Sequence, residues 1–157
     1  MIVGTSQTSK LLWLLLLLSA PASAQRTDST RVRILAGCWT TAVGKFTPAT
    51  ALRGWDSTLT NVPPGIRLDT LPGRGWDGEP RGWLLRTLPG DGGTRFRDGY
   101  FAPVGLDSVE LDWTNGVVGL SIEGRETGDT ISGIARAWTD YMAEERASIT
   151  FRRTTCR

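Results

Sequence analysis

The chain has 157 residues, a formal net charge of +2 and no histidine. A chain of this length is expected to form one domain with a single modest core. The near-balance of charge argues against a nucleic-acid binder held by phosphate contacts. The absence of histidine removes the most common general base and metal ligand, so we expect no metal, no cofactor and no catalysis.

The first 24 residues resemble a secretory signal peptide. Lys10 supplies the positive charge, an apolar run begins at Leu11, and Ala22-Ser23-Ala24 is a small-residue cleavage site. The apolar run is about eleven residues long, whereas a membrane-spanning helix needs about 20. A retained membrane anchor is the alternative. We expect cleavage after Ala24, a domain at 25–157, a secreted or periplasmic location and no stable membrane anchor.

The segment Leu35-Ala36-Gly37-Cys38 has the form of a lipobox, whose cysteine would carry a lipid. A lipobox must end the apolar core of the signal, but the charged residues of 25–33 separate that core from Cys38. Each charge at the centre of a bilayer costs about 2.5–3.5 kcal/mol. The likeness is therefore interpreted as accidental, and Leu35–Val43 is predicted to be the first strand.

The next part of the chain is less regular. Residues 44–63 are either a loop over a barrel mouth or an irregular strand. Ile66 and Leu68 alternate with polar residues, as do Trp83 and Leu85, which predicts two half-buried strands. The Leu-Pro-Gly triplets at 71–73 and 88–90 are predicted turns, and 94–102 is a further predicted strand.

The second half shows clear alternation with a period of two. The apolar sets are Val109, Leu111 and Trp113, then Val118, Leu120 and Ile122, then 131–138, and finally Ile149 and Phe151. Asn115-Gly116 is a strong hairpin signal between the first two sets. About eight short strands result, which is typical of an all-β meander barrel or sandwich.

The two cysteines lie near the ends of the expected domain. In an exported chain such a pair normally forms a disulfide; two free thiols are the alternative. A bond from Cys38 to Cys156 would stabilise the fold by about 4–5 kcal/mol on the loop-entropy model. Alternation turns Trp39 and Phe151 inward and both cysteines outward. This parity favours adjacent first and last strands, so we predict a single antiparallel up-and-down barrel closed by a terminal disulfide.

Gly37-Cys38-Trp39 at the start of the first strand resembles the Gly-x-Trp signature of the lipocalin-like (calycin) barrels. The family's Thr-Asp-Tyr motif is not found at its expected place. In that family an arginine from the last strand packs over the tryptophan at the closed end of the barrel. The resemblance implies this structural role for Trp39 and Arg153, with Arg152 as the alternative, and a barrel that holds a small hydrophobic molecule. The segment 107–140 is also similar to secreted bacterial proteins of unknown function.

Three sets of residues are candidates for function. The leading hypothesis is a monomeric barrel that binds a small, mostly apolar ligand, although a barrel this small is also able to fill with its own side chains and serve a structural role. The proposed cavity lining is Trp83, Leu85, Val109, Leu111, Trp113, Val118 and Leu120.

The runner-up is a carbohydrate or cell-wall binding module that uses Trp55 and Trp76, since glycine, proline and aspartate surround both. Core packing is the alternative for these tryptophans. A carboxylate-based hydrolase using Glu110 and Asp112 comes third, because alternation places both on a solvated strand face.

Overall fold

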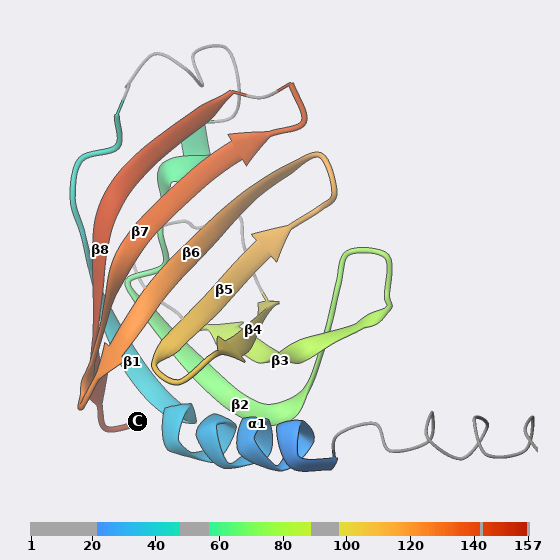
Figure 1. Ribbon diagram of the computed structural model, residues 1–157. Coiled ribbons are helices and arrows are strands. Elements are labelled where there is room, and N and C mark those ends of the chain that lie inside the picture. The colour runs from blue at the N-terminus through green and yellow to red at the C-terminus, as the bar shows by residue number, and fades with distance from the viewer. Residues whose placement is uncertain (1–21, 48–56, 89–97, 142, 157) are drawn as a thin grey trace, which may run out of the picture.

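The computed structural model describes residues 22–47, 57–88, 98–141 and 143–156. Eight antiparallel strands follow one another around a closed barrel (Figure 1), each paired with its neighbours in the sequence, and β1 also pairs with β8. The elements are α1 (Ala22–Leu35), β1 (Gly37–Val43), η2 (Ser57–Thr60), β2 (Gly65–Arg74), β3 (Pro80–Thr87), β4 (Asp98–Val104), β5 (Ser108–Thr114), β6 (Val118–Thr127), β7 (Thr130–Thr139) and β8 (Glu144–Thr154). The predicted all-β, up-and-down barrel is confirmed.

Side-chain alternation builds the core of the barrel. On β5, Val109, Leu111 and Trp113 are buried, whereas Glu110 between them is exposed. The neighbouring strand β6 begins after the Asn115-Gly116 turn. Gly116 has a φ of 89° there, a conformation that favours glycine. Because each strand has one apolar face, closure of the sheet buries these faces together and leaves no open edge.

The chain before β1 is a helix, which sequence patterns did not predict. Leu35 is the last residue of α1 rather than part of the first strand, because Val32 and Leu35 are buried and the strand begins only at Gly37. Figure 1 shows α1 lying across one end of the barrel, where it packs against β2 and β4. Among the described residues, no helix combines the length and apolar character needed to cross a bilayer.

Arg31 fastens α1 to the barrel. Its guanidinium donates to the carbonyl oxygens of Gly105 at 2.7 Å and Ser108 at 3.1 Å, and it forms an ion pair with Glu126 at 3.5 Å. These carbonyls belong to the turn between β4 and β5 and to the start of β5. A nearly buried cation satisfied in this way ties the helix to a specific position on the barrel end.

Arg153 and Trp39 close the same end of the barrel. The guanidinium carbon of Arg153 lies 4.3 Å from the centre of the Trp39 ring, and the two residues are paired across β8 and β1. Arg153 also donates to the carbonyls of Ile34 and Ala36 at the end of α1. Arg152, the alternative, is exposed on the opposite face of β8.

The predicted disulfide joins Cys38 and Cys156, with a Cα–Cα distance of 5.2 Å. It lies beside the last register pair of β1 and β8, Cys38 with Thr154. Cys156 is exposed and Cys38 is buried. The bond therefore fixes the one strand pair that joins the two ends of the sheet.

The other end of the barrel is covered in part by η2. Leu59 of this short helix is fully buried, and η2 packs against β6 and β7. Figure 1 shows it at the end of the barrel opposite α1. Of the region 44–63 that sequence patterns left open, Phe46 is also buried and Thr47 bridges to Arg146, whereas 48–56 lie outside the described residues.

The Leu-Pro-Gly triplets and the strand predicted at 94–102 differ in part from the structure. The Leu-Pro-Gly triplet at 71–73 was predicted to be a turn, but it lies within β2, where register shifts on both sides of Pro72 accommodate the proline. The second triplet lies outside the described residues except for Leu88, and so do residues 94–97 of the strand predicted at 94–102. The described strand β4 begins at Asp98 and ends at Val104, two residues beyond the predicted end.

Candidate functional site

A groove on the outer face of the barrel is the main candidate site. It is a hollow of about 380 Å³ over β4, β5, β6 and β7. Its lining residues are Tyr100, Ala102, Glu110, Leu111, Asp112, Ser121, Ile122, Glu123, Arg136, Trp138 and Glu144. Because the apolar faces of these strands fill the barrel interior, the outward positions are free to carry polar and aromatic side chains.

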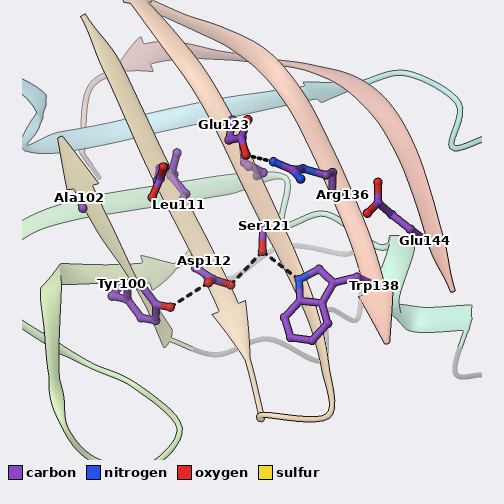
Figure 2. A pocket seen from close by; sticks show the side chains of 11 residues that line it. Tyr100, Ala102, Leu111, Asp112, Ser121, Glu123, Arg136, Trp138 and Glu144 are labelled. Atoms are coloured by element: carbon purple, nitrogen blue, oxygen red, sulfur yellow. Dashed lines mark hydrogen bonds and ion pairs between the residues drawn. The ribbon is translucent and has the colours of Figure 1, made fainter. Parts of the chain in front are cut away.

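A row of hydrogen-bonded side chains crosses the floor of the groove (Figure 2). Tyr100, Asp112 and Ser121 are register partners on β4, β5 and β6. The Tyr100 hydroxyl donates to Asp112 Oδ2 at 2.8 Å, and the Ser121 hydroxyl donates to Asp112 Oδ1 at 3.2 Å. Each oxygen of the carboxylate thus has one protein donor, which fixes its orientation and leaves lone pairs for a further donor.

Trp138 extends this row onto β7. Its indole N–H donates to Ser121 Oγ at 2.9 Å. The indole lies over Gly119, because a Cβ built on that glycine would be 2.6 Å from Trp138 Cζ2. Glycine at this outward position gives the ring room to lie on the sheet, and the hydrogen bond then holds it there. Trp138 is consequently half-buried, with the rest of its ring exposed in the groove.

Partial burial shifts the acidity of the two titratable groups in the row. Burial raises the pKa of Asp112 above 3.8, against the opposing effects of its bonds to Tyr100 and Ser121 and of the nearby Arg81 charge. Burial also raises the pKa of Tyr100 above 10.0, and its bond to Asp112 adds to the rise while Arg81 opposes it. Tyr100 therefore remains a protonated donor at neutral pH.

Charged side chains surround the row. Glu123 forms an ion pair with Arg136 across β6 and β7, which Figure 2 also shows, and Glu144 pairs with Arg146 on β8. Glu110 is exposed on β5, opposite Glu123 in the register. The groove thus offers carboxylate acceptors and a guanidinium donor around an aromatic ring.

The hairpin between β2 and β3 approaches the groove from the side of β4, the strand that pairs with β3 and carries Tyr100. Arg81 at the start of β3 donates a hydrogen bond to Asp77 Oδ2 at 2.9 Å. Interactions with Tyr100 and with Asp77 raise the pKa of the Arg81 guanidinium. Trp76 in the same hairpin is 60% exposed. A Cβ built on Gly116 would lie 2.8 Å from both atoms of the Trp76 ring-fusion bond, so the face of this indole covers Gly116. Trp76 and Trp138 thus lie on two glycines of one segment, the β5–β6 hairpin.

The seven residues proposed to line an internal cavity all belong to inward positions of β3, β5 and β6. Leu85, Val109 and Leu120 have no water-accessible surface, and Leu111 and Trp113 have 1%. Val118 is also buried, and Trp83 is partly buried and packed against the core. A side chain without accessible surface borders no void that a water molecule could enter. The structure therefore gathers the seven residues in one packed core.

The remaining sequence candidates have different positions. Trp55 lies outside the described residues. Asp112 was predicted to lie on a solvated strand face, but it is partly buried and doubly hydrogen-bonded, because Tyr100 and Ser121 flank it on the neighbouring strands. Glu110 is exposed as expected and lines the same groove. Within the described part of the chain, no three acidic or cysteine side chains gather as metal ligands would.

Sequence reasoning did not single out Tyr100, Ser121 or Trp138. One signal was available for Trp138: Ala135 and Ala137 were readable as inward residues, so alternation places the tryptophan between Ala137 and Thr139 on the outer face. Comparison with family models, curated proteins and solved structures found no match for this chain. The eight-stranded antiparallel barrel is compatible with the lipocalin-like fold.

Proposed function

We propose that the protein is an exported, non-catalytic barrel that binds a carbohydrate in the groove on its outer face. The observation that carries the proposal is the position of Trp138. Its indole lies on Gly119, and its N–H donates a hydrogen bond to Ser121. Next to it is the Asp112 carboxylate, which accepts two hydrogen bonds. A sugar ring has an apolar C–H face and a rim of hydroxyl groups. It therefore matches a site that has an aromatic ring beside fixed hydrogen-bonding groups.

The polar groups of the groove suit hydroxyl ligands. Asp112 and Glu110 accept hydrogen bonds, and Arg136 donates them. Glu123 already neutralises Arg136 in part, so the groove has no strong excess of positive charge that would select phosphate. Neutral polyols, which both donate and accept, complement this mixture best.

Trp76 supports the proposal as a second aromatic surface. Its indole is largely exposed although it lies on Gly116, and the Asp77–Arg81 ion pair holds the hairpin that carries it. An exposed aromatic ring that is supported by backbone pays little further ordering entropy on binding. We propose that Trp76 contacts the same ligand from the hairpin side.

An apolar ligand inside the barrel is the competing proposal. It requires the packed side chains around Leu111 and Trp113 to move apart, because both residues are only 1% exposed. Quenching of tryptophan fluorescence by fatty acids or retinoid-like probes would favour this alternative. We favour the outer groove because it is already formed.

Affinity electrophoresis tests the proposal directly. The exported protein is run in native gels that contain hydroxyethyl cellulose, glycol chitin or xylan. We expect retardation by at least one of them, lost in Trp138→Ala and weakened in Trp76→Ala. Leu106→Ala is the control, because Leu106 is 91% exposed in the turn between β4 and β5 and does not line the groove. Unretarded wild-type protein in all gels, or equal retardation of wild type and Trp138→Ala, would refute the proposal.

Export and the absence of catalysis have separate tests. The intact mass of the exported protein should equal residues 25–157 less two hydrogens, for cleavage after Ala24 and one disulfide. A lipid-bearing chain that begins at Cys38 would contradict this. Incubation with the retarding polysaccharide should release no new reducing ends; release that disappears in Asp112→Asn would instead indicate the carboxylate-based hydrolase.

A further inference from the structure

The outer groove continues beyond the row of Tyr100, Asp112 and Ser121. A second hollow of about 390 Å³ lies over β5, β6 and β7, and its lining residues are Val104, Ser108, Val109, Glu110, Glu123, Gly124, Arg125 and Ser132. Glu110 and Glu123 line both hollows, so the two meet at this register pair. The candidate site is therefore one half of a longer groove that follows the strands.

The length of this groove exceeds one sugar ring. Trp138 marks one end of it and Ser132 the other, and both lie on β7. Six residue steps along a strand span roughly 20 Å at about 3.3 Å per residue. A bound monosaccharide at Trp138 would leave the half at Ser132 empty, whereas a linear chain of sugars would occupy both halves.

The two halves differ in chemistry. The first holds Trp138 and Tyr100, and the second has hydroxyl and charged side chains from Ser108, Arg125 and Ser132. The Arg125 guanidinium is held by Asp107 at 2.6 Å. One sugar would stack on the indole, and the units that follow it would be bound mainly through their hydroxyl groups.

We propose that the ligand is a linear glycan that lies along β5–β7, with one ring on Trp138 and further units in the second hollow. This inference rests on the proposed function, because it extends the same site. Each additional unit in the second hollow gains hydrogen bonds to fixed side chains, so affinity rises with chain length. An increase of roughly tenfold from disaccharide to tetrasaccharide corresponds to one or two such bonds.

Titration calorimetry with a length series tests the inference. The probes are cello-oligosaccharides and N-acetylchito-oligosaccharides from the disaccharide to the hexasaccharide. Ser132→Leu places a bulky side chain without an aromatic face in the second hollow, from an exposed, outward position on β7. We expect this variant to bind disaccharide as the wild type does and to lose the gain with length. Thr40→Leu is the control, because Thr40 is exposed on β1 and lines neither hollow.

The outcomes separate the two proposals. If the disaccharide binds and longer chains bind no better, or if Ser132→Leu keeps the full gain with length, the linear-glycan inference is wrong and carbohydrate binding at Trp138 stands. If no oligosaccharide binds and no polysaccharide retards the protein, both proposals are wrong. Thermal unfolding of each variant by circular dichroism verifies that the barrel is intact before either conclusion is drawn.

Discussion

Substitution of Arg153 by methionine is expected to destabilise the barrel by several kcal/mol. The guanidinium donates to Ala36 O at 3.0 Å and to Ile34 O at 2.6 Å, and it covers the Trp39 ring at 4.3 Å. Ile34 is in the last turn of α1 and Ala36 directly follows the helix, where carbonyls have no intrahelical donor. One side chain therefore joins the helix, β1 and β8 at the closed end.

The expected loss follows from these contacts. Each hydrogen bond from a charged donor contributes about 1.5 kcal/mol at the low end of its range, which suits a side chain that is 28% exposed. The cation over an aromatic ring adds about 1 kcal/mol. The ion pair with the exposed Asp129 adds little. Because Met preserves the length of the apolar stem, Arg153→Met should lose about 3–4 kcal/mol of unfolding free energy.

Urea unfolding followed by far-ultraviolet circular dichroism measures this loss, with the disulfide intact in every protein. Arg152→Met is the matched control, since Arg152 is the adjacent residue, is exposed and points outward. It should change the unfolding free energy by less than about 0.5 kcal/mol. A loss below about 1 kcal/mol in Arg153→Met, or equal losses in the two variants, would refute the role assigned to Arg153.

Three further predictions concern the disulfide and the groove. Cys38→Ser/Cys156→Ser should lose about 5 kcal/mol in urea unfolding, because the bond closes a loop of 118 residues; a loss below about 2 kcal/mol would contradict the loop-entropy account. Since burial holds the pKa of Asp112 above 3.8, the folded chain binds this proton at higher pH than the unfolded chain. The contribution of Asp112 to stability should therefore fall as pH rises from 3.8 to the raised folded pKa, and urea unfolding across that range should show no such fall in Asp112→Asn. Gly119→Ala should displace the Trp138 ring, lower stability by about 1–3 kcal/mol and abolish retardation by polysaccharide as Trp138→Ala does; normal retardation would mean that the ring position is unimportant.

The barrel was predictable from the sequence because its determinants are local. Alternation at Val109, Leu111 and Trp113 indicates one buried face, and Asn115-Gly116 fixes the turn that follows. Because alternation turns both Trp39 and Phe151 inward, the first and last strands were predicted to be adjacent, and β1 and β8 do pair. Each of these features acts within one strand or one hairpin.

Helix α1 was not predictable in the same way. Its described part has few apolar residues facing the barrel, and its position depends on Arg31, whose acceptors are carbonyl oxygens about 74 residues farther along the chain. No periodicity within 22–35 encodes those acceptors. The charged stretch was therefore interpreted as a connection between the signal and the first strand.

The groove required strand register as well as strand identity. Asp112 and Ser121 face each other because the β5–β6 hairpin sets their pairing, and that pairing was within reach of the sequence. Tyr100 joins them only through the register of β4 with β5. The turn between β4 and β5 has the sequence Gly105-Leu106-Asp107 and contains neither Asn-Gly nor Asp-Gly, so local pattern did not fix this register.

The same strands supply the core on one face and the groove on the other, and this division determines how the site is held. Leu111 and Ile122 are buried register partners, and the next pair, Asp112 and Ser121, points outward. A shift of register by one residue would exchange the two faces and place a carboxylate in the apolar core, which burial without partners makes very costly. The packing of the core therefore fixes the spacing of the groove side chains, as a site on rigid strands requires. It follows that substitutions of outward residues alter the groove while the inward residues continue to specify the barrel, so loss of glycan binding in a folded Trp138→Ala protein would identify a binding residue.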